Sequence, residues 1–247
     1  MIGNRCFFFC VPLALAVLLS GCKEKNSDAI EHLRGDFAAK REQLASLAKQ
    51  MPPLGSVTKS TLPSKLTPPI SHDAKGSGAV NSELLMAAQV ANPDVVLQSP
   101  QQVDLLLGDE LITCLQWTGP NNPMAASTLS ARHGESLEKD CRAALGYRYL
   151  VALRPSAYAR PVAVDEQHYT PGKLDLEGFL FDLSSSKLLG AFHVSAVSAD
   201  RVTYAARKSE RKEDRLEAFA YSTLWENARA EIVKALAPLA SGPFTTK

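Results

Sequence analysis

Residues 173–197, with the sequence KLDLEGFLFDLSSSKLLGAFHVSAV, contain the clearest hairpin pattern in the chain. Lys173–Leu183 and Leu188–Val197 are both rich in apolar residues. The polar run Ser184–Lys187 between them is the kind of short connection that joins two antiparallel strands. This stretch therefore predicts a long β-hairpin.

Segments on both sides of the hairpin are predicted to add strands. Tyr147–Leu153 is rich in aromatic and β-branched residues, and Arg201–Ala205 follows the hairpin after a short turn. Further upstream, Val103–Leu107 and Leu111–Thr118 flank a Gly108-Asp109 turn. Because short loops join these neighbours, we expect a mainly antiparallel sheet of about four to six strands.

Three segments around these strands are predicted to be helical. Ser82–Val90 is short, and Glu135–Leu145 ends near Gly146. The last helix follows the charged run Arg207–Arg215 and continues to about Leu239. One side of it collects the apolar residues Tyr221, Leu224, Trp225, Ala228, Ile232, Ala235, Leu236 and Leu239. We expect that side to cover one face of the sheet, which gives a two-layer α+β domain over residues 81–247.

Residues 26–51 are predicted to form an amphipathic helix. Its narrow apolar seam consists of Ile30, Leu33, Phe37, Leu44, Leu47 and Met51, with Lys40 as the one polar interruption. A seam with seven-residue spacing favours self-association as a coiled coil, which predicts a homo-oligomer through residues 26–51. The alternatives are that the helix lies on a membrane or folds back onto its own domain.

Residues 52–80 have a different composition, with five prolines, three glycines, five serines and three threonines. Such a stretch is typical of a disordered linker. As a loose coil it spans about 30 Å, and as an extended chain up to about 90 Å. It would therefore hold a folded body away from whatever precedes it.

The overall composition is that of a globular protein with no strong charge. The 247 residues are 45% hydrophobic, and the formal net charge is +1. Without residues 1–21, which contain one basic residue, Arg5, and no acidic one, the chain is neutral. A neutral chain lacks the electrostatic footprint of a nucleic-acid-binding protein, so we expect no nucleic acid among its partners.

The first 21 residues have the pattern of a targeting segment. After Arg5, the apolar run Cys6–Leu19 is broken only by Pro12 and is too short to span a bilayer, which needs about 20 residues. It ends in Leu19-Ser20-Gly21-Cys22, which resembles the lipobox of bacterial lipoproteins. The resemblance implies cleavage before Cys22, lipid on that cysteine and attachment to a membrane through the lipid.

The same resemblance suggests a location. Lys23 and Glu24 follow the cysteine, where the aspartate associated with inner-membrane retention in enterobacterial lipoproteins is absent. This implies the outer membrane, with the domain in the periplasm. The predicted order is a signal peptide (1–21), a lipidated helix (22–51), a linker (52–80) and a periplasmic domain (81–247).

Cysteine usage agrees with an exported protein. Cys6 and Cys10 lie in the signal segment and Cys22 is the predicted lipid site, which leaves Cys114 and Cys141 in the domain. In an oxidising space such a pair often forms a disulfide, and its loop closure would contribute about 3 kcal/mol to stability. The alternative is two separate buried thiols.

Few residues in the chain suggest chemistry. No HExxH, CxxC pair, GxSxG, phosphate loop or dinucleotide fingerprint is present, and we expect no cofactor or bound metal. Asp165, Glu166 and His168 are the candidate catalytic cluster, because two carboxylates beside an imidazole can perform acid–base chemistry. Adjacent loop carboxylates are, however, more often simply solvated.

A second candidate site is a loop suited to recognition. Trp117, Asn121 and Asn122 offer a stacking face and amide donors, although a tryptophan at a strand end is more often part of the core. The leading hypothesis is a non-enzymatic binding or accessory module that contacts an envelope protein or a cell-wall component. The alternative is a cell-wall or small-molecule hydrolase that uses Asp165, Glu166 and His168.

Overall fold

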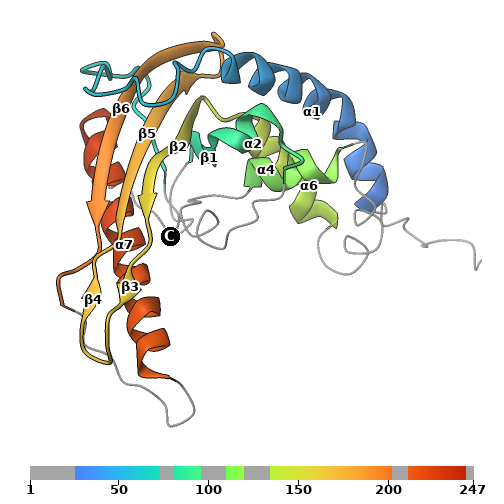
Figure 1. Ribbon diagram of the computed structural model, residues 1–247. Coiled ribbons are helices and arrows are strands. Elements are labelled where there is room, and N and C mark those ends of the chain that lie inside the picture. The colour runs from blue at the N-terminus through green and yellow to red at the C-terminus, as the bar shows by residue number, and fades with distance from the viewer. Residues whose placement is uncertain (1–25, 73–79, 96–109, 120–133, 202–210, 243–247) are drawn as a thin grey trace, which may run out of the picture.

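The computed structural model describes residues 26–72, 80–95, 110–119, 134–201 and 211–242 (Figure 1). A four-stranded sheet lies between helices and has the strand order β1-β2-β5-β6. The strands are β1 (Ser82–Met86), β2 (Tyr149–Ala159), β5 (Lys173–Asp182) and β6 (Lys187–Val197). The predicted hairpin is confirmed as β5 and β6, and β2 pairs antiparallel with β5.

The prediction of an antiparallel sheet is wrong for β1, which runs parallel to β2. Parallel neighbours need a crossover connection of a dozen or more residues. The chain makes this crossover between Met86 and Tyr149, through the helices α2 (Ala87–Ala91), α4 (Glu110–Trp117) and α6 (Gly134–Leu145). The sheet is therefore mixed, with its parallel pair at one edge.

Two local predictions upstream of β2 are also corrected. The predicted helix Ser82–Val90 begins as strand β1, in which all five residues are buried, so the alternation that marks a half-exposed strand is missing. The predicted strand Leu111–Thr118 is instead helix α4, which buries Leu111, Ile112, Cys114 and Leu115 on one side. The predicted strand Val103–Leu107, and Arg201–Ala205 beyond its first residue, lie outside the described residues.

The C-terminal helix is found as predicted and covers one face of the sheet. It comprises α7 (Lys212–Leu236) and the 3-10 turn η2 (Ala237–Leu239). The helix shares its core with sheet residues that all point to this face: Leu84, Val151, Leu176, Leu180, Phe192 and Val194. The opposite face is also covered, so the described domain has three layers rather than the two that were predicted (Figure 1).

The opposite face is covered by α1 (Asn26–Ala48) together with α4 and α6. The buried seam residues of α1 are Leu33, Phe37, Leu44 and Leu47. They contact the sheet and the neighbouring helices of the same chain, so the fold-back alternative describes this part of the seam. The side chain of Ile30 lies outside the described part of the structure, and self-association through residues 26–51 stays a prediction. Of the described helices, none has the length and the apolar character that crossing a bilayer requires.

Residues 52–72, which we call the strap, pack against the domain although they were predicted as part of a disordered linker. At the β6 edge, the Thr61 N–H donates to the Ala191 carbonyl at 2.8 Å. Past that edge, Leu66 and Ile70 are buried in the core under α7, and the Ile70 N–H donates to the Leu239 carbonyl at 3.0 Å. These apolar anchors override the linker-like composition. Residues 73–79 lie outside the described residues.

The close approach of the strap to β6 depends on Gly190. A Cβ atom at this position would lie 2.5 Å from the Thr61 carbonyl oxygen, which real side chains do not tolerate. The strap therefore covers part of an otherwise open sheet edge.

A small hairpin, here called the tip, lies between β2 and β5. It consists of β3 (Val162–Ala163) and β4 (Tyr169–Thr170) and projects beyond the main sheet beside the first half of α7 (Figure 1). Glu217 of α7 holds it by accepting hydrogen bonds from the Ala163 N–H at 3.0 Å and from Arg160 at 2.7 Å. The tip is thus attached to α7 mainly through polar contacts.

Candidate functional site

The predicted cluster of Asp165, Glu166 and His168 occupies the turn of the tip. The Asp165 carboxylate accepts hydrogen bonds from the backbone N–H groups of Gln167 at 2.7 Å and His168 at 2.8 Å. The His168 Nδ1 lies 2.8 Å from Asp165 Oδ2, whereas Glu166 forms an ion pair with Lys212 of α7. The structure brings Asp165 and His168 together, but Glu166 contributes to a different contact.

The surroundings of this cluster suit a turn better than catalysis. The side chains of His168 and Asp165 are 72% and 54% exposed. Hydrogen bonds from the Gln167 backbone and from the His168 side chain hold the pKa of Asp165 below its ordinary value. A carboxyl that serves as a general acid needs the opposite shift, which burial usually provides. The arrangement therefore stabilises the turn.

The predicted recognition loop is described only at its first residues. Trp117 is the last residue of α4 and packs, partly buried, against the core beneath α1. Asn121 and Asn122 lie outside the described residues, as does Cys22. Trp117 therefore contributes to the core, which was the alternative to a role in recognition.

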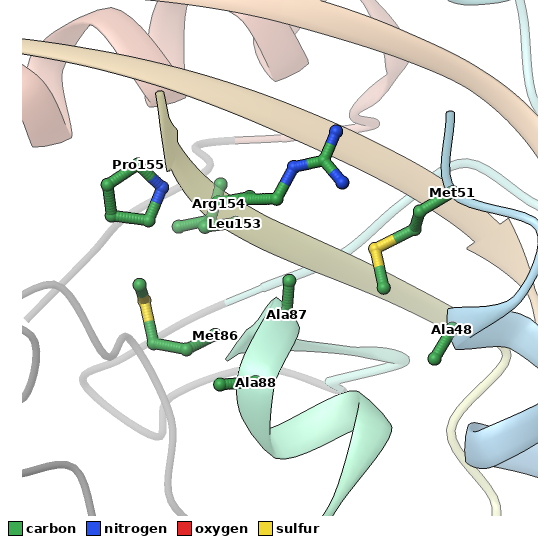
Figure 2. Close-up of a pocket in the computed structure, with 8 residues that line it drawn as sticks. All are labelled: Ala48, Met51, Met86, Ala87, Ala88, Leu153, Arg154 and Pro155. Carbon is green, nitrogen blue, oxygen red and sulfur yellow. The ribbon is translucent and has the colours of Figure 1, made fainter. Parts of the chain in front are cut away.

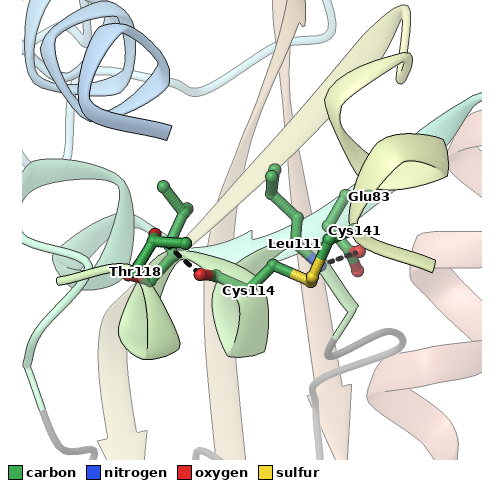
Figure 3. Close-up of a disulfide and its surroundings, with 6 residues drawn as sticks. Glu83, Leu111, Cys114, Thr118 and Cys141 are labelled. Carbon is green, nitrogen blue, oxygen red and sulfur yellow. Dashed lines mark hydrogen bonds between the residues drawn. A yellow bond between two sulfur atoms is a disulfide. The ribbon is translucent and has the colours of Figure 1, made fainter. Parts of the chain in front are cut away.

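The predicted disulfide between Cys114 and Cys141 is confirmed (Figure 3). It joins α4 to α6, with the two Cα atoms 5.6 Å apart and both residues buried. The end of α4 is further closed by Thr118, whose hydroxyl donates to the Cys114 carbonyl at 2.8 Å. The bond therefore holds two short helices together beneath the layer of α1.

A buried acid, Glu83, lies beside the disulfide and was not a predicted site residue. It is 1% exposed, and its carboxylate accepts a hydrogen bond from the Leu84 backbone N–H at 3.3 Å. A second comes from the Leu111 backbone N–H at 3.4 Å (Figure 3). Leu111 is in the first turn of α4, where unpaired N–H groups and the helix dipole favour a negative charge. Glu83 therefore attaches α4 to the sheet.

A second buried acid, Glu177, pairs with Arg154 across strands β5 and β2. The two residues are directly opposite in the register. Glu177 is 1% exposed, and its Oε2 accepts hydrogen bonds from Arg154 Nε at 3.0 Å and Nη2 at 2.7 Å. The other oxygen accepts a hydrogen bond from the Val57 N–H of the strap at 3.0 Å. Both carboxylate oxygens are thus satisfied, as burial of a charge requires.

Arg154 also fixes the beginning of the strap. Its Nη2 donates to the carbonyls of Pro52 at 2.8 Å and Pro53 at 3.1 Å, and its guanidinium lies 4.8 Å from the centre of the Phe179 ring. A guanidinium suits such a position because it is planar and can donate in several directions at once. The Arg154–Glu177 pair therefore joins two strands and the strap.

Arg154 also lines a cavity of about 360 Å³ (Figure 2). The other described residues of its wall are apolar: Ala48, Met51, Met86, Ala87, Ala88, Leu153 and Pro155. They come from the end of α1, from Met51 directly before the strap, from the junction of β1 and α2, and from β2. A mostly apolar hollow with one polar group is the usual form of a binding site.

The polar character of this sheet face continues away from the cavity. His193 is the β6 partner of Glu177 in the register, and Asp175 is paired with Ser195 one step further along. Burial opposes the ionisation of Asp175, but hydrogen bonds from Ser195 and Lys173 and the charges of Lys173 and His193 outweigh it, so its pKa lies below the ordinary value. Within the described ranges, no group of three His, Cys, Asp or Glu side chains is arranged to hold a metal ion.

The cavity and its arginine were missed because they depend on strand register. Glu177 and Glu83 are each an acid within a largely apolar strand, and this was the signal that the sequence offered. Glu83 is the one acid of β1, whereas Glu177 shares β5 with Asp175 and Asp182. No known protein-family model matches this chain, and no curated protein matches it either.

Proposed function

We propose that the protein is a lipid-anchored component of a bacterial cell envelope and that its domain is a non-enzymatic binding or accessory module. The anchor is lipid on Cys22, in the lipobox-like sequence Leu19-Ser20-Gly21-Cys22. The proposed site is the periplasmic side of the outer membrane, since Lys23 rather than aspartate follows the cysteine. The partner is an envelope protein or a cell-wall component.

The observation that carries the extracytoplasmic assignment is the buried disulfide between Cys114 and Cys141. Disulfides of this structural kind persist in oxidising compartments and are rare where thiols are kept reduced. Together with an apolar leader segment that ends at a cysteine, the disulfide supports export followed by anchoring.

The packing of α1 shortens the proposed reach of the anchor. Four Cα–Cα steps lead from Cys22 to Asn26, where α1 begins, and they span at most about 14 Å. Leu33, the first buried residue among the described side chains of α1, is seven helical residues further on, or about 10 Å. We therefore propose that the domain is held close to the membrane, because the strap does not lie between the anchor and the body.

Binding is favoured over catalysis by the character of the cavity. Seven of the eight described residues that line it are apolar, and the eighth, Arg154, is neutralised by Glu177. The hydrolase alternative would rely on Asp165 and His168, which lie exposed in the turn of the tip and do not line this cavity. Its residues lack the shielding from water that acid–base catalysis uses.

The anchor is tested by replacing single cysteines in the full chain and growing cells with labelled palmitate. Cys22→Ala should abolish labelling and leave a slower-migrating precursor, whereas Cys10→Ala, a matched change in the same leader, should be labelled and processed normally. Normal labelling and membrane fractionation of the Cys22→Ala protein would overturn the proposal.

A further inference from the structure

We propose that the cavity beside Arg154 receives an apolar side chain of a partner polypeptide, and that Arg154 Nη1 donates to a backbone carbonyl next to that side chain. This inference rests on the proposed function, because it names the kind of contact that a binding module of the envelope would make. It specifies a peptide segment with an apolar anchor residue as the ligand.

The size and the wall of the cavity suit an apolar anchor. Its volume of about 360 Å³ falls at the lower end of the range of ligand pockets. Met51 and Met86 form facing parts of the wall in Figure 2, with Leu153 and Ala87 between them. Methionine side chains are flexible and polarisable, and surfaces built from them adapt to apolar groups of different shapes.

Arg154 has donor capacity that the described fold does not use. Its Nε and Nη2 donate to Glu177 and to the carbonyls of Pro52 and Pro53, and no described residue accepts a hydrogen bond from Nη1. The guanidinium is held rigidly by these bonds and by its position over the Phe179 ring. A donor that is already fixed loses little entropy when it binds a ligand.

The balance of charge favours a neutral acceptor. Glu177 already compensates the charge of Arg154, and no other charged side chain is among the described residues of the wall. A second carboxylate would add a negative charge that nothing in this wall neutralises. A peptide carbonyl adds none, and Arg154 already binds two peptide carbonyls of the strap in this way.

The position of the cavity on α1 favours a polypeptide over a membrane lipid. Ala48, at the end of α1, lines the cavity, while the proposed lipid site precedes the start of α1 at Asn26. The 22 helical steps between these residues correspond to about 33 Å. The cavity is therefore at the opposite end of α1 from the proposed anchor.

The test uses the full chain as cells produce it, labelled with ¹³C at the methionine methyl groups, and capped amino acids as probes. Met51→Leu and Met86→Leu assign the two resonances. N-acetyl-leucinamide should shift both resonances in a saturable manner, whereas N-acetyl-glycinamide, which lacks the apolar side chain, should shift neither. N-acetyl-leucine, which carries a carboxylate, should bind more weakly than the amide.

Two substitutions at exposed alanines of helices distinguish binding in the cavity from a general effect of a large side chain on the protein. Ala88→Phe fills the mouth of the cavity and should weaken binding of N-acetyl-leucinamide at least about tenfold. Ala39→Phe, on an exposed position of α1 outside the cavity, should leave binding unchanged. Arg154→Lys keeps the charge but loses Nη1. It should reduce the preference for N-acetyl-leucinamide over methyl octanoate, a lipid-like probe without an amide. Thermal unfolding checks that the variant is folded.

Absence of a shift at Met51 and Met86, or equal weakening by Ala88→Phe and Ala39→Phe, would overturn the inference. Binding of methyl octanoate without binding of N-acetyl-leucinamide would overturn it in favour of a lipid. Intact mass spectrometry of the same sample reports lipid on Cys22 separately. A lipidated protein without the shifts refutes the cavity alone, whereas shifts in an unlipidated protein refute the anchor alone.

Discussion

Two pairs of an acidic and a basic side chain, one in the body of the sheet and one in the tip, have almost the same contact distance. Arg154 Nη2 lies 2.7 Å from Glu177 Oε2, and His168 Nδ1 lies 2.8 Å from Asp165 Oδ2. The Glu177 side chain is 1% exposed and the Asp165 side chain is 54% exposed. Water competes for the second pair and hardly reaches the carboxylate of the first.

Contact distance alone therefore does not identify a functional site. An exposed pair contributes about 0–1 kcal/mol, because solvent screens it and holding two side chains together costs entropy. Breaking a buried pair leaves an uncompensated charge and costs about 3–5 kcal/mol. The pair in the body also holds the strap and borders a cavity, whereas the pair in the tip shapes its own turn.

The largest expected effect comes from breaking the buried pair. Arg154→Ala should lower the free energy of unfolding by about 3–5 kcal/mol, because Glu177 keeps its charge without its partner. Urea denaturation measures the change. Arg160→Ala, which removes an exposed partner of Glu217, is the matched control and should cost about 1 kcal/mol or less.

Removing both charges together should be milder than removing one. Arg154→Met combined with Glu177→Gln should recover much of the stability lost in Arg154→Ala, because no buried charge remains. A loss of less than about 1 kcal/mol for Arg154→Ala alone would show that burial does not make the Arg154–Glu177 pair stronger than the exposed pair in the tip.

The next largest effect concerns the disulfide beneath α1. Replacing Cys114 and Cys141 together by alanine should lower the free energy of unfolding by about 3 kcal/mol, since the closed loop no longer restricts the unfolded chain. Chemical denaturation under non-reducing conditions measures this. Reductant should destabilise the wild type but leave the double variant unchanged, and free thiols in the denatured, unreduced wild type would contradict the bond.

A smaller, pH-dependent effect is expected for Asp175, which lies on the same sheet face as Glu177. Its folded-state pKa is lowered, so it stabilises the fold above the ordinary pKa of about 4, and this stabilisation is lost as the pH falls through the folded value. Asp175→Asn should flatten the dependence of stability on pH in that acidic range, by up to about 1 kcal/mol.

The control for this measurement is Asp36→Asn, at an exposed position of α1. With this change, the free energy of unfolding should depend on pH in the acidic range much as it does in the wild type. If the free energy of unfolding of Asp175→Asn depends on pH in the acidic range as that of the wild type does, the hydrogen bonds from Ser195 and Lys173 do not stabilise the carboxylate.

The smallest effect is expected at the tip. His168→Ala removes an exposed side chain whose partner, Asp165, keeps its backbone hydrogen bonds, so stability should change by about 0.5 kcal/mol or less. Thermal unfolding measures the change. A loss comparable to that of Arg154→Ala would show that the tip contributes to the fold in a way that its exposure does not suggest.

Local patterns allowed much of the fold to be predicted. The hairpin of β5 and β6 follows from two apolar runs around Ser184–Lys187, and α7 follows from the apolar side that includes Leu224 and Ile232. The pairing of Cys114 with Cys141 followed from counting, because no other cysteines remained after the leader and Cys22. In each case the deciding information lies within a short stretch or within the composition.

The errors concern segments whose structure depends on distant residues. The β1 strand looked helical because both of its faces are buried, and its direction depends on the crossover to β2. The seam of α1 fits either a partner helix or the domain itself, and only tertiary packing decides between them. The strap looked disordered by composition, but the buried residues Leu66 and Ile70 attach it to the core and hydrogen bonds to Glu177 and Ala191 hold it at the sheet.

The candidate site was the least predictable part. Asp165 and His168 attracted attention because they are neighbours in the sequence, whereas 22 residues lie between Arg154 and Glu177 and only the strand register brings them together. An acid within a largely apolar strand is the signal that points to Glu177, but Asp175 and Asp182 of the same strand share it, so the pattern alone does not single out Glu177.

The most direct test of the claim that the body, not the tip, makes the contact is photo-crosslinking in intact cells. A photo-reactive residue is placed at Ala88, at the cavity, or at Gln167, in the exposed turn of the tip. We predict a discrete polypeptide adduct from position 88 and none from position 167. Adducts from position 167 without adducts from position 88 would contradict the account.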